Sequence, residues 1–265
     1  MRAGTQSFSI CMAERLQPGS VWLFNPVTHI KQFRTGGCLV ETATGLTVQC
    51  KKVVVSIPTP LYSTISFSPQ LPPSKLQLSE STLLGYYSKL ILVYSEPWWR
   101  TAGLSGTLSS SAEGPISFTR DTCIEGELGQ FSITCFMVGE TGRVWSLLPK
   151  AARRTSVLQH FKRMMTAHVK PEDIPRPINI LEIQWTNEPW SRGAPSPAMG
   201  AGLLTSNVGK ALVTPHKNVH FVGTETSNVW KTFMEGAVRS GERGAQEVIE
   251  ALRLEKLGGG AKAML

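Results

Sequence analysis

The sequence lacks a complete glycine fingerprint for binding a dinucleotide. That fingerprint, GxGxxG, lies between a strand and a helix and is followed by an acidic residue about twenty positions later. Gly200-Ala201-Gly202 has no third glycine and no strand–helix context, and Gly258-Gly259-Gly260 falls in a tail that we expect to be flexible. The sequence therefore excludes a self-contained dinucleotide-binding domain within these 265 residues.

Clustered metal ligands and long apolar runs are also missing. The five cysteines are scattered and form no CxxC pair supported by histidine, so we expect no zinc site. An odd number of scattered thiols is typical of a reducing compartment. No apolar run reaches the roughly 18 residues of a membrane span, and no secretory signal is recognisable. We expect a cytoplasmic protein, or a peroxisomal one if Ala263-Met264-Leu265 acts as a degenerate peroxisomal signal.

Acidic residues are outnumbered, but the excess of basic residues is not concentrated. Lys and Arg number 27 against 19 Asp and Glu, which gives a net charge of +8. Only small basic pairs occur, at Arg153-Arg154 and Lys162-Arg163, and this dispersal argues against a nucleic-acid partner. A hydrophobic content of 41% with 17% charged residues is typical of a folded globular protein.

The strongest local pattern runs from residue 219 to residue 252. It predicts a short buried strand at 219–223, a polar turn at 224–228 and an amphipathic helix from about Phe233. Because the first N–H groups of a helix lack partners and carry partial positive charge, this predicts an anion-binding corner. An ordinary C-terminal helix packed on a sheet is the alternative. The helix has small or apolar residues at spacings of one, three and four: Met234, Ala237, Val238, Gly241, Ala245, Val248, Ile249 and Leu252.

The amino-acid sequence of this stretch closely resembles the C-terminal flavin-binding motif of the flavin-containing amine oxidases: it contains GTET, followed by Trp230, MEGA and SGERGA. The chain is similar to the C-terminal half of a fungal-type monoamine oxidase. The resemblance implies an α/β (α+β) fold, in which flavin-binding segments are interwoven with a mixed-sheet substrate domain. It implies that Glu225 binds the ribityl hydroxyls of FAD, with Gly223 and Thr224 beside it. The backbone at Phe233 and Met234 would face the pyrimidine edge of the flavin.

The same resemblance assigns roles to residues outside this corner. Val27 matches the position that meets the FAD adenine, and Ser56 lies on the pyrophosphate side. Lys89 matches a lysine that holds a water against the flavin N5, and Trp185 matches a tryptophan that lines the ring. The catalytic residues implied are Lys89, Trp185 and Phe233. Without the resemblance, Lys89 is a lysine on the solvent face of a strand, and Val27 and Ser56 are ordinary core and turn residues.

Two substitutions distinguish this chain from animal monoamine oxidases. Ala194 stands where those enzymes attach FAD to a cysteine, so the resemblance implies non-covalent FAD. The next position, Pro195, normally supplies one aromatic wall of the amine cage, and the other wall is Phe233. Trp190 and Trp230 are candidates to replace the missing wall.

The remaining pattern predicts a mixture of helices and strands. We expect helices at 4–16, 74–83 and 150–168. We expect strands at 21–24, 29–33, 38–41, 46–50, 53–55, 86–94, 104–108, 116–120, 130–138 and 178–185, with 53–55 buried on both faces. By resemblance, residues 1–78 and 188–253 are flavin-binding segments, 79–187 is a substrate-binding segment and 254–265 is a flexible tail.

The expected function is FAD-dependent oxidative deamination, which converts an amine, dioxygen and water to an aldehyde, ammonia and hydrogen peroxide. Its partners would be a small amine and dioxygen, together with an N-terminal half or a second copy that completes the flavin site. Two alternatives stay open. One is a non-catalytic fragment or interaction protein, which the missing fingerprint supports. The other is a polyamine or L-amino-acid oxidase, although no motif places the arginine that an amino-acid substrate requires.

Overall fold

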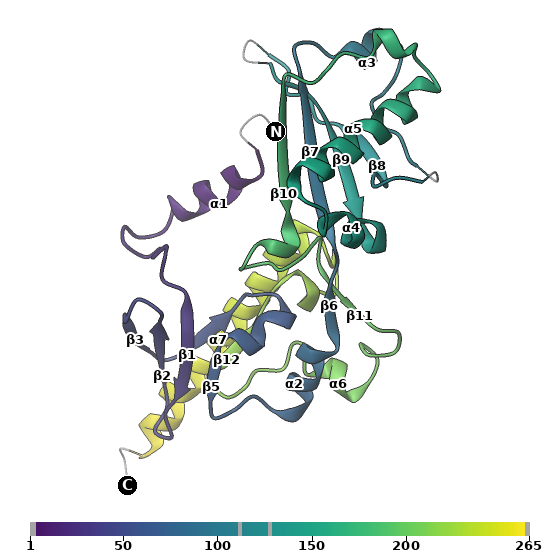
Figure 1. Ribbon diagram of the computed structural model, residues 1–265. Coiled ribbons are helices and arrows are strands. Elements are labelled where there is room, and N and C mark those ends of the chain that lie inside the picture. Colours follow the sequence, from purple (N-terminus) through teal and green to yellow (C-terminus); the bar gives the residue numbers. More distant parts are fainter. Residues whose placement is uncertain (1–3, 111–112, 127–128, 263–265) are drawn as a thin grey trace. The chain divides into compact units, whose positions relative to one another are not determined.

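The computed structural model describes residues 4–110, 113–126 and 129–262, and the chain divides into two compact units (Figure 1). Unit 1 comprises Met1–Val21 and Gly85–Ala194, and unit 2 comprises Trp22–Leu84 and Pro195–Leu265. Each unit combines helices with β-sheet, so the expected mixed α/β class is confirmed. The assignment of flavin-binding and substrate-binding segments stays a prediction.

Unit 1 is built on an antiparallel sheet with the strand order β10-β7-β9-β8. Its strands are β7 (Tyr87–Tyr94), β8 (Phe118–Asp121), β9 (Phe131–Val138) and β10 (Asn179–Gln184). Residues on β7 alternate between half-buried and buried, which places Leu90 and Leu92 in the core and Lys89 on the opposite face. The predicted strand at 86–94 is therefore confirmed.

Four helices belong to unit 1: α1 (Gln6–Ala13), α3 (Trp98–Thr101), α4 (Gly139–Ser146) and α5 (Lys150–Thr166). Val157 and Phe161 of α5 are buried in one cluster with Leu90 and Leu92. Burying each such side chain contributes about 1.5–3 kcal/mol. The predicted helix at 150–168 is confirmed, whereas α1 buries none of its residues.

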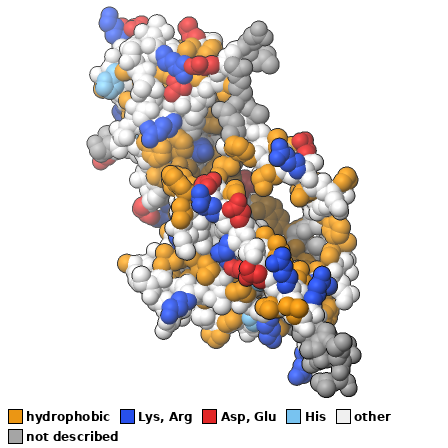
Figure 2. All heavy atoms as spheres, turned by 180° about the vertical axis from the view of Figure 1, so that it is seen from behind, with side chains coloured by type: hydrophobic (Ala, Val, Ile, Leu, Met, Phe, Trp, Pro, Cys, Tyr) orange, Lys and Arg blue, Asp and Glu red, His pale blue; other side chains and the backbone are white. Residues whose placement is uncertain are grey.

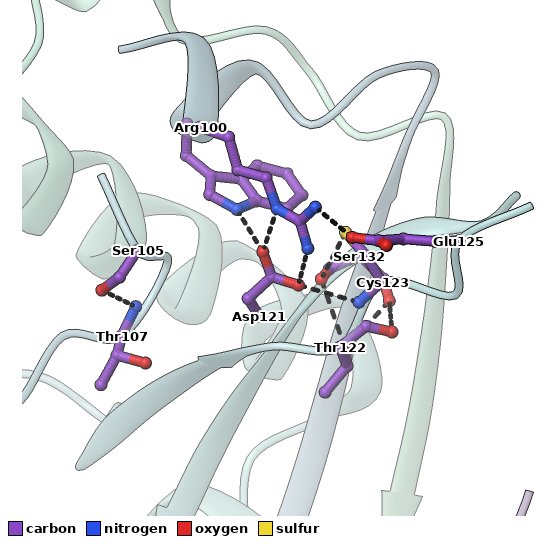
Figure 3. Close-up of polar contacts among 9 residues, drawn as sticks. Arg100, Ser105, Thr107, Asp121, Thr122, Cys123, Glu125 and Ser132 are labelled. Atoms are coloured by element: carbon purple, nitrogen blue, oxygen red, sulfur yellow. Dashed lines mark hydrogen bonds and ion pairs between the residues drawn. The ribbon is translucent and has the colours of Figure 1, made fainter. Parts of the chain in front are cut away.

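A polar network joins α3 to the end of β8 (Figure 3). Arg100 contacts both carboxylate oxygens of Asp121, at 2.7 Å and 3.1 Å, and the indole N–H of Trp99 donates to the same carboxylate at 2.9 Å. Burial opposes ionisation of Asp121, but the donors of Arg100, Cys123 and Trp99 hold its pKa below the usual range. The network fixes the hairpin edge of unit 1.

Unit 2 contains a four-stranded sheet with the order β3-β2-β1-β5 and two two-stranded sheets. In the larger sheet, β1 pairs antiparallel with β2 and parallel with β5. The strand β12 pairs parallel with β4, and β11 pairs antiparallel with β6. The strands are β1 (Val27–Gln32), β2 (Cys38–Thr42), β3 (Thr47–Cys50), β4 (Val53–Val55), β5 (Ser66–Ser68), β6 (Thr82–Leu84), β11 (Pro197–Met199) and β12 (Val219–Phe221).

The helices of unit 2 are α2 (Pro73–Glu80), α6 (Asn207–Lys210) and α7 (Met234–Lys262), with the 3₁₀ turns η1 (Thr59–Thr64) and η4 (Thr224–Thr226). The core includes Ile30, Tyr62 and Phe221. Lys75 of α2 is buried beside this core. Its ammonium donates to the carbonyl of Ala211 at 2.5 Å and lies 3.6 Å from the centroid of the Phe221 ring.

Several expected strands differ from the structure. Residues 21–24 and 104–108 are not strands, because neither segment pairs as a ladder with a described strand. The expectation that 53–55 is buried on both faces is wrong, since Val54 is 46% exposed on a strand that pairs only with β12. The final helix continues to Lys262, through residues expected to form the tail.

Candidate functional site

The predicted corner of unit 2 is formed by β12, η4 and the start of α7. Gly223 follows the strand with φ +142°, a backbone conformation that favours glycine. Its N–H donates to Ser240 Oγ on α7 at 3.0 Å. Arg243, one turn further, donates to the Phe221 carbonyl at 2.9 Å and to Thr226 Oγ1 at 3.0 Å. These contacts fix the strand, the turn and the helix as one piece.

Glu225 lies inside this corner and is only 4% exposed. Its Oε1 accepts hydrogen bonds from the N–H of Thr59 at 2.9 Å and from Thr59 Oγ1 at 3.0 Å. Its Oε2 accepts no hydrogen bond from the residues that the structure describes. A Cβ added at Gly223 would lie 2.8 Å from Oε2, so the absence of a side chain there keeps this oxygen unobstructed. The Glu225 carboxylate thus has one oxygen, Oε1, that holds Thr59 and a second, Oε2, that is free to accept a hydrogen bond.

The start of α7 is open. Phe233 is 60% exposed and Met234 is 55% exposed, while the Trp230 and Phe233 rings meet edge to face at 5.8 Å. Within the described part of the chain, the N–H groups of Met234 and Glu235 have no hydrogen-bond acceptor. Unpaired helix N–H groups favour a negatively charged or electron-rich ligand. The start of α7 therefore offers two unpaired N–H groups to such a ligand.

The buried face of α7 differs from the predicted apolar stripe. Met234 and Val238, both in that stripe, are exposed, whereas Gly236, Ser240 and Gly244 are buried. An added Cβ would lie 2.2 Å from the Trp230 carbonyl oxygen at Gly236 and 2.4 Å from Val222 at Gly244. Gly236 and Gly244 thus lie in close backbone or side-chain contact, whereas a Cβ added at Gly241, which belongs to the predicted stripe, would meet nothing within 4 Å.

Val27 and Ser56 belong to the same unit as the corner. Val27 begins β1 and packs against the cluster that contains Phe221. Ser56 is exposed, just after β4. Three residues later, Thr59 makes its two contacts with Glu225, so the loop that carries Ser56 is joined directly to the corner. Thr59 itself was missed by sequence reasoning, because a threonine after a proline carries no motif.

Lys89 and Trp185 lie together in unit 1. Lys89 is directly opposite Ile183 of β10, and Trp185 begins the 3₁₀ turn η3 (Trp185–Asn187) two residues later. The ammonium of Lys89 lies 5.4 Å from the Phe136 ring centroid. Phe136 stacks on Phe118 at 4.5 Å. The rings of Phe118 and Phe136 beside Lys89 were not predicted. The sequence did contain one signal for an aromatic neighbour, because the two-residue period of a strand places Tyr87 on the same face as Lys89.

The segment that follows Trp185 approaches the start of β7. The Ala194 N–H donates to the Gly85 carbonyl at 3.1 Å, and a Cβ added at Gly85 would lie 2.8 Å from the Ala194 carbonyl oxygen. Glycine at position 85 therefore permits a close backbone contact. Trp190, a candidate to replace the aromatic wall missing at Pro195, is 69% exposed.

Within the described residues, charged groups form no other candidate centre. Among the described residues, no group of three or more His, Cys, Asp or Glu side chains is placed to hold a metal ion. Lys and Arg side chains stand among acidic and apolar ones on the face drawn in Figure 2. A cavity of about 410 Å³ in unit 1 lies beside α4, but its one carboxylate, Glu140, is paired with Arg143. No helix in the described ranges is long and apolar enough to cross a membrane.

Comparison with known proteins identifies the family to which the chain is similar. The profile of the flavin-containing amine oxidoreductase family matches residues 1–249. The chain is 33% identical to flavin-containing amine oxidase B of Canis lupus familiaris, over 88% of this chain and 44% of that protein. It is 33% identical to an L-amino acid dehydrogenase of Synechocystis, over 88% of this chain and 47% of that protein.

A solved structure of putrescine oxidase bound to putrescine matches with a TM-score of 0.83 and 28% identity. That match covers 94% of this chain and 53% of the solved chain. The chain thus spans about half the length of the relatives that it matches.

Proposed function

Because the chain belongs to the flavin-containing amine oxidoreductase family, we propose that the protein that contains it oxidises amines with FAD and dioxygen. The products would be an imine, which water hydrolyses to an aldehyde and ammonia, and hydrogen peroxide. The observation that carries the proposal is the free Oε2 of Glu225 beside Gly223, at a corner that also opens onto the start of α7.

Family membership implies a flavin, and the residues of unit 2 fit one. The ribityl chain carries hydroxyl donors, and the free carboxylate oxygen of Glu225 is an acceptor for such donors. The unpaired N–H groups of Met234 and Glu235 suit the electron-rich edge of the ring. When bound, a flavin would supply the two-electron chemistry that links oxidation of the amine C–H bond to reduction of dioxygen. Val27 and the loop of Ser56 would contact the adenosine diphosphate part.

We further propose that the flavin is held without a covalent bond. Alanine at position 194 offers no sulfur to form a thioether. Retention then depends on hydrogen bonds and packing at the corner, so the flavin should be released when the protein is unfolded. The dinucleotide fingerprint that these 265 residues lack would have to come from a segment outside them or from a partner chain.

Lys89, Trp185 and Phe233 are proposed to act on the substrate side. Lys89 would hold a water for the reaction with oxygen, and its position beside Phe136 keeps the ammonium next to apolar surface. Trp185 would offer a flat surface that orients a neutral amine, and the exposed ring of Phe233 is proposed for the same role. The protein's part is thus to bind the amine, to orient it and to exclude water. The proposed location is the cytoplasm or the peroxisome.

An amino-acid substrate is a second candidate, favoured by one observation in unit 1. The Arg120 guanidinium lies 5.5 Å from the centroid of the Phe118 ring, which stacks on Phe136 beside Lys89. A guanidinium near the proposed amine site suits a carboxylate. Arg120→Leu should then raise the KM for an amino acid and leave that for a simple amine unchanged. Equal effects on both substrates would eliminate this candidate.

The experiment that tests the main proposal measures peroxide formed with amines by the protein loaded with FAD. We expect amine-dependent peroxide, and we expect Lys89→Met to slow reoxidation of the flavin more than its reduction. Lys31→Met, an exposed lysine on β1, is the matched control. A protein that holds FAD but transfers no electrons from any amine or amino acid would contradict the proposed activity and favour the non-catalytic alternative.

A further inference from the structure

Two of the cysteines face each other across neighbouring strands of unit 2. Cys38 begins β2 and Cys50 ends β3, and the antiparallel register places them directly opposite each other. Directly opposite residues in such a pair have Cα atoms about 4.5–5.5 Å apart. This range lies within the roughly 4.4–6.8 Å that a disulfide spans. The register therefore places the two cysteines where a disulfide can form with little backbone movement.

The two thiols differ in access to solvent. Burial raises the pKa of Cys50, and the neighbouring Cys38 thiol opposes part of that rise. Cys38 is fully buried, whereas Cys50 is half-buried. A small oxidant from solvent therefore reaches Cys50 first, and Cys38 lies where it can attack the oxidised sulfur.

A cation stands near the pair. Lys52, whose side chain is largely buried, donates from Nζ to Asn218 Oδ1 at 2.7 Å and pairs with Glu255 at 2.5 Å. Burial raises the pKa of Cys38 to about 11, with Cys50 adding to the rise and the positive charge of Lys52 opposing it. Both sulfurs are thus mainly protonated at neutral pH. Their oxidation should be slow there and should accelerate as the pH rises, because the thiolate is the nucleophile.

We propose that Cys38 and Cys50 form a reversible disulfide when the protein meets hydrogen peroxide. The Cys50 sulfur attacks one peroxide oxygen, the O–O bond breaks, and a sulfenic acid and one water result. The Cys38 sulfur then attacks the oxidised sulfur, an S–S bond forms and a second water leaves. Two thiols lose two electrons and two protons, and one peroxide becomes two waters. Peroxide is a product of the proposed function, but the disulfide needs only added peroxide and stands without it.

The other thiols provide controls. Cys11 is exposed on α1, and Cys123 is half-buried in unit 1, where its sulfur lies 3.9 Å from the Ser132 carbonyl oxygen. Cys135 is buried on β9. The register of β8 and β9 places Cys135 opposite Thr119, not opposite another cysteine. Among the described cysteines, the Cys38–Cys50 pair is thus the one aligned across a strand ladder.

The test exposes the reduced chain to hydrogen peroxide at pH 7 and pH 9, quenches it by alkylation and maps the peptides without reductant. We use Cys11→Ser as the background, which prevents disulfides between molecules through this exposed thiol. We expect a linked pair of peptides that contain Cys38 and Cys50, lighter by two hydrogen atoms than the reduced pair. It should form faster at pH 9 and disappear with dithiothreitol.

Two further variants separate the proposal from general oxidation. Adding Cys123→Ser should leave the linked peptides unchanged, and adding Cys50→Ser should abolish them. The oxidised chain should also unfold at a higher temperature than the reduced chain, and this shift should be lost with Cys50→Ser, since a cross-link restricts the unfolded chain. The proposal is overturned if Cys38 and Cys50 stay free while Cys123 is oxidised, or if Cys50 proceeds to sulfinic acid without linking to Cys38.

Discussion

Replacing the buried Lys75 by methionine should remove a pH dependence of stability that its burial creates. Burial lowers the pKa of Lys75 from 10.5 to about 7, with the nearby charge of Arg243 adding to the effect. The unfolded chain therefore binds a proton at this lysine that the folded chain does not, between about pH 7 and pH 10.5. In that window stability rises with pH, and below pH 7 the full cost of the buried charge applies.

The magnitude follows from these two values. Each unit of pKa corresponds to about 1.4 kcal/mol, so a fall from 10.5 to about 7 costs the folded state about 5 kcal/mol at acidic pH. Methionine has a similar volume and no charge, but it leaves the Ala211 carbonyl without its donor, at a cost of about 1–3 kcal/mol. The slope of the unfolding free energy with pH reports the charge of Lys75 alone, because the cost of the lost hydrogen bond does not change with pH.

The assay is urea unfolding of the wild type and Lys75→Met at several pH values from 6 to 9, below the unfolded pKa of 10.5. Above pH 7, the free energy of unfolding of the wild type should gain up to about 1.4 kcal/mol per pH unit more than that of the variant. Lys51→Met, which changes an exposed lysine, should leave the profile parallel to the wild type. Parallel profiles for Lys75→Met would refute the reasoning about its burial.

Three other substitutions test the packing and electrostatics of the two units. Asp121→Asn should lower the free energy of unfolding by about 2–3 kcal/mol at pH 7, because Arg100 and Trp99 lose their charged acceptor. The difference should begin to shrink below pH 3.8, where the unfolded carboxyl is protonated, and should vanish only at the lower pH that protonates the folded one. Gly244→Ala should destabilise by about 1–3 kcal/mol in a thermal melt, because the new methyl would lie 2.4 Å from Val222. Gly241→Ala, on the same helix with nothing within 4 Å, should stabilise by about 0.5–1 kcal/mol, and a loss in both variants would contradict the assigned buried face.

Strands were predictable where apolar periodicity agreed with pairing. The apolar run of β7 predicted a strand, and the structure then shows which of its faces is buried. The same reasoning failed at residues 21–24, which are apolar but have no strand partner in the described structure. It also failed at Val54, where parallel pairing with β12 alone leaves one face uncovered. Pairing between distant segments is not encoded in a local pattern.

The candidate site was predictable as a motif but not as a set of contacts. The family resemblance identified the corner and its Glu225, and the structure shows that carboxylate buried with one oxygen free. The partner Thr59 lies 166 residues away and has no sequence signal. The burial of Lys75 likewise depends on Phe221 and Ala211, which arrive from other parts of the chain. The buried face of α7 was misjudged because glycine and serine, not large apolar residues, meet the turn.

The central claim is that the corner of β12 and α7 binds FAD through Glu225. The most direct measurement is a fluorescence titration of FAD into the chain and into two matched variants. Glu225→Gln keeps an oxygen for Thr59 but removes the charge, whereas Glu235→Gln changes an exposed glutamate in the first turn of the same helix.

We expect saturable binding to the wild type, a rise in Kd of roughly tenfold or more for Glu225→Gln, which corresponds to about 1.4 kcal/mol or more, and a much smaller rise for Glu235→Gln. Circular dichroism would verify that both variants are folded. Equal affinities for the wild type and Glu225→Gln would contradict the account.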